Sequence, residues 1–387
     1  MLRNRVIRAG TLSAALLMLG TSPALAAPTS PLDAASSEVT LHVQPADGYR
    51  PIVDFIRSAE HSLDFFIYQF NDARIARELR AAHARGVDVR VMFTWQVFPA
   101  GSNLWDPTSP NFNTNMPTFN ALKRAGISVK LSPFTYTYSH AKTMIADGDW
   151  SSGRALIMDF NAQPSYLVPT QGQIGTRGFA ITTSNPADVQ EIQRVFDADW
   201  DRRTPPAYAS PRLIWSPNGD GYRPVSAGKQ RIFTLIDTAR TSLDVYALLL
   251  DYLPFQDRLI AAARRGVTVR IITNTEPAAM TFAQVQALHS AGVQIAFDPT
   301  YPGGSLFIHS KAIIRDAGTA HAMAFVGSEN PGDSVSMNSE RELGILVDRP
   351  SITQRMRGAF DLDWSRARPL EVIDGVVKDP YWERRAS

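Results

Sequence analysis

The 387-residue sequence contains no cysteine, which excludes a disulfide framework, a thiolate zinc site and a cysteine nucleophile. Its N-terminal apolar run, at residues 11–20, is shorter than the roughly 20 residues that a membrane-spanning helix needs. The composition, 44% hydrophobic and 20% charged, is that of an ordinary globular protein. A chain of this length predicts two domains of roughly 150 residues each.

The first 26 residues have the three parts of a secretory leader. Arg3, Arg5 and Arg8 precede the apolar run, and small residues follow it at positions 24–26. We expect cleavage after Ala26 and a secreted or periplasmic protein. Because no cysteine follows the apolar run, a lipoprotein anchor is excluded.

Cleavage would also remove the small positive charge. Residues 1–26 contain three arginines and no acidic residue, so the formal net charge changes from +2 to −1. Proteins that grip duplex DNA nonspecifically usually carry a basic surplus, because their affinity comes from displacing phosphate counterions. The absence of such a surplus disfavours a nucleic-acid partner, although a local basic patch stays open.

The chain repeats itself. Residues 62–68 resemble residues 242–248, and residues 85–91 resemble residues 265–271, both with a displacement of 180 positions. Residues 196–200 likewise match residues 360–364. Matched segments in the same order indicate a tandem duplication whose loops differ in length.

Each copy alternates helical stretches with short apolar strands. Gly86 and Gly266 follow arginines at the ends of two predicted helices, where glycine takes the left-handed conformation. This alternation predicts an α/β class with two duplicated α/β sandwich domains. We place the domains at residues 38–203 and 212–368, with a proline-rich linker between them and a C-terminal tail at 369–387.

A shared motif, H-x-K-x(4)-D, occurs once in each copy. The first motif comprises His140, Lys142 and Asp147, and the second comprises His309, Lys311 and Asp316. Residues two apart on a strand point to the same face, so each copy presents an imidazole and a cation together. Asn161 and Asn330 each stand 14 positions after the aspartate.

With these motifs the sequence resembles the phospholipase D superfamily, whose signature is H-x-K-x(4)-D followed by G-S-x-N and a glutamate before a strand. The resemblance covers roughly residues 38–368. It implies two domains with mixed sheets that pack about a pseudo-twofold axis, and one active site at their interface. The resemblance assigns the histidine, lysine and aspartate of both motifs to the catalytic set, although we expect Asp147 and Asp316 to support the local geometry without touching substrate.

The residues suit attack on a phosphodiester. Lys142 and Lys311 would neutralise the nonbridging oxygens. Hydrogen bonds to these oxygens would come from Asn161, Ser328 and Asn330. One imidazole would form a covalent phosphohistidine while the other acts as general acid. We expect neither a cofactor nor a metal, and the choice between His140 and His309 as nucleophile stays open.

An attacking imidazole needs an acceptor on its other nitrogen. By the family pattern Glu342 orients the histidine of the second copy, and Glu340 is the alternative register. The first copy departs from the pattern, with Asp159 in place of serine and Gly178 in place of glutamate. One hypothesis is that Asp159 orients His140; the alternative is a specialised or weakened site.

We therefore predict an exported, monomeric phosphodiesterase that hydrolyses or transphosphatidylates glycerophospholipids. An aromatic-rich segment at residues 94–119 suggests transient contact with a membrane surface, while stacking on bases or covering the sheet are the alternatives. It contains Trp95, Phe98, Trp105, Phe112 and Phe119. Two other functions stay open: a metal-independent nuclease of the same fold and a noncatalytic phosphate-binding protein.

Overall fold

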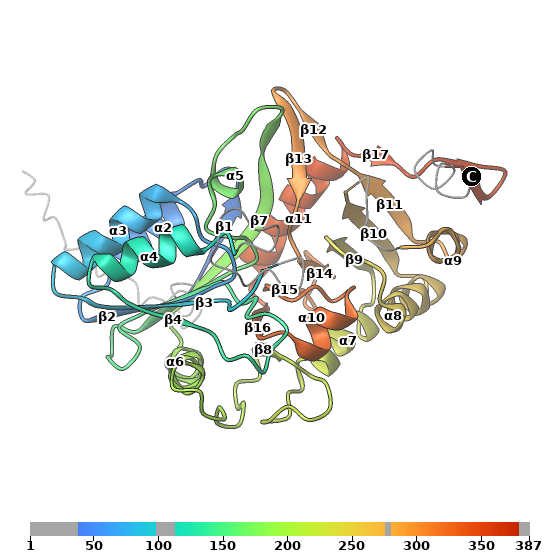
Figure 1. Cartoon of the computed structure of the whole chain (residues 1–387). Coiled ribbons are helices and arrows are strands. Elements are labelled where there is room, and N and C mark those ends of the chain that lie inside the picture. Colours follow the sequence, from blue (N-terminus) through green and yellow to red (C-terminus); the bar gives the residue numbers. More distant parts are fainter. Residues whose placement is uncertain (1–37, 98–112, 275–279, 379–387) are drawn as a thin grey trace, which may run out of the picture.

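A computed structural model describes residues 38–97, 113–274 and 280–378 (Figure 1). The predicted leader lies outside the described residues. The first half of the chain occupies one side of the molecule and the second half the other. An eight-stranded sheet lies in the second half, and a nine-stranded sheet combines the strands of the first half with two strands, at residues 300–301 and 304–308, from the second. Both halves combine strands and helices, so the predicted class, two duplicated α/β sandwich domains with mixed sheets, is confirmed.

The first half contains seven strands and five helices among its described residues. Its strands are β1 (Val39–Gln44), β2 (Ser62–Ile67), β3 (Asp88–Phe93), β4 (Ser128–Leu131), β5 (Thr143–Ala146), β6 (Arg154–Met158) and β7 (Gln173–Thr183). Its helices are α2 (Arg50–Arg57), α3 (Ala73–Ala84), α4 (Met116–Arg124), α5 (Pro164–Leu167) and α6 (Pro186–Trp200).

The second half repeats this order and adds a hairpin, β12–β13, before its motif. Its main strands are β8 (Leu213–Ser216), β9 (Ser242–Tyr246), β10 (Thr268–Thr273), β11 (Gln294–Phe297), β12 (Thr300–Tyr301), β13 (Gly304–Ile308), β14 (Ile313–Arg315), β15 (Met323–Gly327) and β16 (Glu342–Val347). The helices are α7 (Gly228–Asp237), α8 (Leu253–Arg264), α9 (Phe282–Ser290), α10 (Ser334–Ser339) and α11 (Pro350–Trp364). Short strands β17 (Arg368–Pro369), β18 (Val372–Ile373) and β19 (Val376–Val377) follow.

The two sheets share one topology. In the first half the order β4-β3-β2-β5-β6-β7 begins with parallel strands and continues antiparallel, and β1 pairs with β7. The second half has the equivalent order β11-β10-β9-β14-β15-β16-β8. Each H-x-K motif therefore runs into the central strand of its sheet, β5 or β14, where apolar residues are buried on both faces.

Local sequence explains the helix ends. Helices α3 and α8 stop before Gly86 and Gly266, whose φ angles are 95° and 89°. Only a residue without a Cβ adopts this conformation without strain, so the chain turns there into β3 and β10. The helix–glycine–strand units predicted for both copies are present.

The core has three layers of apolar packing. Helices α2, α3 and α4 cover the outer face of the first sheet, and α7, α8 and α9 cover that of the second. Helices α6 and α11 lie in a central cluster to which both sheets contribute, including Phe179, Phe196, Trp215 and Phe360. The halves thus share one continuous core at their junction.

Two buried ion pairs lock this junction. Arg177 on β7 binds Asp363 at the end of α11 through two hydrogen bonds of 2.7 and 2.8 Å. At the equivalent place Arg341 binds Asp199 at the end of α6, with an Nε–Oδ2 distance of 2.8 Å. These aspartates belong to the repeated segments 196–200 and 360–364. Their role is to join one half to the other.

No helix among the described residues is long and apolar enough to cross a membrane.

Candidate active site

Both motif histidines line a single cavity of about 700 Å³ between the halves. His140 approaches it from the first half and His309 from the second, with 8% and 6% of their surfaces exposed. Asn161 and Asn330 line the same cavity. The structure thus brings together residues that the sequence separates by 169 positions.

The lysines lie beneath the imidazoles. Lys142 and Lys311 are completely buried and each donates a hydrogen bond to the carbonyl oxygen of its own motif histidine. Lys311 Nζ also lies 2.8 Å from Nδ1 of His309. Burial favours the neutral amine and lowers the pKa of Lys142 to about 8. An anionic phosphoryl group in the cavity would stabilise the charged form of both lysines.

Carboxylates surround His140. Its Nδ1 lies 3.2 Å from Oε2 of Glu342 and 3.5 Å from Oε2 of Glu340. Glu342 is itself held, since its Oε1 accepts a 2.5 Å hydrogen bond from Ser336, whose Oγ accepts from the N–H of Asn330. A carboxylate at Nδ1 keeps the proton there and leaves Nε2 free to attack.

This glutamate comes from the other half of the chain. The N–H groups of His140 and Ala141 both donate to the carbonyl oxygen of Arg341, and Arg341 N–H donates to Tyr138. The segment that leads into the first motif is therefore paired with the residue just before Glu342. The equivalent pairing joins Ile308 to Arg177, through β13 and β7.

The expected assignment of the orienting groups was therefore wrong in both copies. Glu342 serves His140 and not His309. Asp159 faces His309 and not His140: its carbonyl oxygen lies 3.0 Å from Nδ1 of His309. The physical reason is that each motif pairs with the other half of the chain. The segment at His140 is hydrogen-bonded to Arg341, which precedes Glu342, and the strand that leads to His309 pairs with β7, which contains Arg177.

The Asp159 carboxylate has a structural role beside the imidazole. Its Oδ1 accepts from the N–H of Phe179 at 2.8 Å, and its Oδ2 accepts from the Ser310 hydroxyl at 2.6 Å. Burial raises its pKa to about 6. A Cβ at Gly178 would lie 2.7 Å from Phe160 Cδ1 and 2.8 Å from Asp159 Oδ1, so a glutamate there would collide with both side chains. The local packing of the first copy therefore favours glycine at this position.

Burial controls the charge of the two imidazoles. It lowers the pKa of His140 to about 4, helped by Lys142 and opposed by Glu342. Burial and the nearby Lys311 also lower the pKa of His309 well below its ordinary value. Both rings are therefore neutral at pH 7, which suits a nucleophile.

The predicted phosphate ligands separate into two groups. The side-chain oxygens of Asn161 and Asn330 are buried without a hydrogen-bond partner, while the amide nitrogen of Asn161 donates to Gln69 at 3.3 Å. The Ser328 hydroxyl does not reach the cavity, because it bonds the main chain of Leu343. We therefore correct its predicted role: it fixes two neighbouring strands, as Asp159 does in the first copy.

Asp147 and Asp316 also lie away from the cavity. Asp147 has a φ of 54° and accepts hydrogen bonds from the N–H groups of residues 60–62. Asp316, with a φ of 49°, binds residues 240–242 in the same way. Both aspartates stand at the far ends of β5 and β14. We therefore correct the role that the resemblance implied: they support the turn, as expected from their motif position, and do not belong to the catalytic set.

Sequence reasoning missed Glu329, a fully buried carboxyl next to the site. Neither of its oxygens has a hydrogen-bond partner, and burial together with Glu342 raises its pKa well above the ordinary range. Glu329 follows Ser328 in the second G-S-x-N segment and occupies the x position. The signature allows any residue there, so it could not single out Glu329. The equivalent residue of the first half is Phe160.

The cavity walls differ between the halves. The first half contributes Tyr68 and Tyr166, whose rings stand edge-on to His140 and His309 at 4.5 and 4.8 Å between centroids. At the equivalent positions the second half has Leu248 and Val335. Among the described residues that line the cavity none is arginine or lysine, while Asp333 and Glu340 are acidic.

Only part of the aromatic segment lies within the described residues. Phe119 is buried in α4 against Phe93 and belongs to the core. Trp95 donates a hydrogen bond to the carbonyl oxygen of Tyr136. Phe98, Trp105 and Phe112 lie outside the described residues, so membrane contact by this segment stays a prediction.

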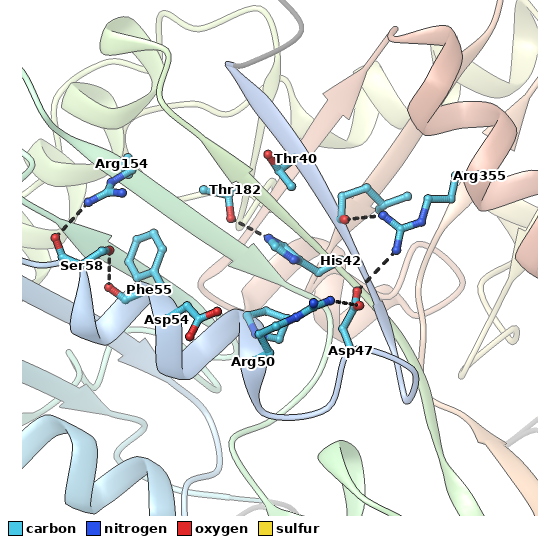
Figure 2. A pocket seen from close by; sticks show the side chains of 12 residues that line it. Thr40, His42, Asp47, Arg50, Asp54, Phe55, Ser58, Arg154, Thr182 and Arg355 are labelled. Atoms are coloured by element: carbon cyan, nitrogen blue, oxygen red, sulfur yellow. Dashed lines mark hydrogen bonds and ion pairs between the residues drawn. The ribbon is translucent and has the colours of Figure 1, made fainter.

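A second pocket of about 550 Å³ lies between α2, the edge of the first sheet and α11 (Figure 2). Three of its charged groups contact one another: Asp47 binds Arg50 at 2.8 Å and lies 3.6 Å from Arg355. His42 Nε2 lies 2.9 Å from the Thr182 hydroxyl oxygen, within hydrogen-bond distance.

Comparison with known proteins agrees with this geometry. A family model described as "Cardiolipin synthase, PLD-like domain" matches the chain twice, over residues 52–200 and 232–364, which together exceed half of its length. Phospholipase D Z of Dictyostelium discoideum is 31% identical over 133 residues, covering 34% of this chain and 28% of the relative. The mitochondrial cardiolipin hydrolase of Danio rerio is 22% identical over 152 residues, 38% of this chain and 63% of the relative. The chain thus spans about a quarter of the first relative's length.

Solved structures show the same fold. Phosphatidylserine synthase of Haemophilus influenzae superposes with a TM-score of 0.62 at 10% identity, covering 91% of this chain and 92% of that protein. Polyphosphate kinase of Porphyromonas gingivalis gives a TM-score of 0.63 at 18% identity, over 87% of this chain and 52% of that protein. With two matched domains and one histidine–lysine site at their junction, the chain belongs to the phospholipase D superfamily.

Proposed function

We propose that the protein is a phospholipase D-type phosphodiesterase that cleaves glycerophospholipids. The observation that carries this proposal is the cavity itself: two neutral imidazoles, one from each half, line one space whose walls are largely apolar. Leu248, Leu249 and Phe307 suit the apolar part of a lipid, and the described lining contains no arginine or lysine to hold the neighbouring phosphates of a polynucleotide.

The residues support a two-step reaction. One imidazole, in its neutral form, attacks phosphorus, and the P–O bond to the head-group alcohol breaks. The second imidazole gives a proton to that alcohol; it takes up this proton from solvent when the anionic phosphodiester binds and raises its pKa. Lys142 and Lys311 stabilise the charge on the nonbridging oxygens. Water then donates its proton to the second imidazole and releases phosphatidate. An alcohol that replaces water would yield a new phosphodiester, which is transphosphatidylation.

Hydrolysis of phosphatidylcholine vesicles by the purified protein in excess chelator tests this function. We expect choline release that is lost in both His140→Ala and His309→Ala, since one imidazole is the nucleophile and the other transfers the proton. Nicking of plasmid DNA without lipid cleavage would favour a nuclease. Binding of vesicles without any cleavage would favour a phosphate-binding protein.

We further propose that the protein is exported as a monomer and that its leader is removed after Ala26. The pattern of arginines, apolar run and small residues supports this proposal. Intact-mass measurement of the protein from its native host would show a chain beginning at Ala27. A full-length mass would contradict export by this route.

A further inference from the structure

The orienting carboxylates of His140 form a cluster with the composition of a metal site. His140, Glu340 and Glu342 each direct one ligand atom to a common region, and these atoms all lie within 4.8 Å of one another. All three residues are more than nine-tenths buried. An imidazole with two carboxylates is a donor set that suits Zn²⁺.

Two of the ligand atoms are also unpartnered. Nδ1 of His140 and Oε2 of Glu342 make no hydrogen bond of good geometry, although both are buried. Buried polar atoms are nearly always bonded, so such a pair side by side indicates a place for a further ligand. No equivalent exists at His309, where the Asp159 carboxylate is already satisfied by Phe179 and Ser310.

The spacing fits tetrahedral coordination. Zinc bonds to imidazole nitrogen and carboxylate oxygen are about 2.0–2.2 Å long, which gives a tetrahedron edge of about 3.3–3.5 Å. The distances from His140 Nδ1 to Glu342 and Glu340 are 3.2 and 3.5 Å. The hydrogen bond from Ser336 holds the other oxygen of Glu342, as outer-shell groups do in metal sites. Because His140 and Glu340 line the cavity, an ion would have an open path and a free fourth position.

We propose that His140 Nδ1, Glu340 and Glu342 bind one divalent transition-metal ion of the Zn²⁺ class. The ion displaces the proton from Nδ1, which leaves to solvent, and takes the place of the direct 3.2 Å contact between Nδ1 and Glu342. Its charge withdraws electron density from the ring and so weakens Nε2 as a nucleophile or base. If the proposed function holds, the ion therefore acts as a reversible inhibitor.

Calorimetric titration of the chelator-treated protein with Zn²⁺ tests the site without reference to catalysis. We expect one saturable site per chain, and Glu340→Gln should weaken binding at least about tenfold, since it removes a charged ligand. Asp333→Asn is the matched control, because Asp333 lines the same cavity outside the cluster. Its zinc affinity should fall much less than that of Glu340→Gln, because Asp333 supplies no ligand atom to the cluster. Melting temperatures would show that both variants fold.

Titration with Co²⁺ provides a second measurement on the unmodified protein. A tetrahedral site gives intense visible absorption bands, and Zn²⁺ should abolish them at one equivalent. The absence of a one-to-one site, or equal loss in Glu340→Gln and Asp333→Asn, would overturn the proposed site. Zinc binding that leaves lipid hydrolysis unchanged would refute the inhibition, whereas binding without any hydrolysis in chelator would count against the proposed function alone.

Discussion

The crossed orientation of the imidazoles predicts a large effect of Glu342→Gln. The substitution keeps the size of the side chain but removes the charge that stands 3.2 Å from His140 Nδ1. An amide can also present its NH₂ group to Nδ1 and so stabilise the wrong tautomer. We expect kcat for phosphatidylcholine hydrolysis to fall by about 10²- to 10⁴-fold, the range for loss of positioned proton transfer. This corresponds to about 3–5 kcal/mol of transition-state stabilisation.

Asp159→Asn is the matched control on the other side of the site. Only the main-chain oxygen of Asp159 faces the His309 ring, and an amide oxygen can still accept from Phe179. We expect its kcat to stay within about tenfold of the wild type, because the group that fixes the proton on His309 is unchanged.

The measurement is steady-state choline release over a range of vesicle concentrations, so that kcat and KM are separated. A fall in kcat at constant KM in Glu342→Gln would indicate a role in the transition state only. Equal losses in the two variants, or a larger loss in Asp159→Asn, would refute the assignment of Glu342 to His140.

Three further predictions concern stability. Asp199→Ala leaves the Arg341 guanidinium buried without its carboxylate, so urea unfolding should show that the free energy of unfolding falls by about 3–5 kcal/mol. The control Asp201→Ala, at an exposed acidic residue, should change it little. Burial raises the pKa of Glu329, so its stabilising contribution is present at low pH and lost as the pH rises. The stability of Glu329→Gln relative to wild type should therefore increase from pH 5 to 9, and a constant difference would contradict this. His140 has a pKa of about 4 in the folded protein, so the unfolded chain binds more protons between pH 6.5 and 4. As the pH falls through this range, wild-type stability should decrease more than that of His140→Asn, by up to about 3 kcal/mol. Parallel stability curves in thermal unfolding would exclude this.

Local patterns predicted much of the fold. The arginine–glycine pairs set the ends of α3 and α8, because the left-handed conformation at Gly86 and Gly266 depends on the residue itself. The repeats predicted two similar sheets, since equal sequences have equal local preferences. The same repeats missed the part played by Asp199 and Asp363, because a salt bridge between halves depends on a partner more than 140 positions away.

The sequence by itself determined the duplication, the α/β class and the chemical identity of the site, because two H-x-K motifs at matched spacing admit few other interpretations. Only the tertiary structure decided which carboxylate faces which imidazole. That relation follows from the pairing of Arg341 with the segment before His140, and of Arg177 with β13. Hydrogen bonds between the halves are formed by backbone groups that every residue carries, so no residue pattern along the chain could reveal the exchange.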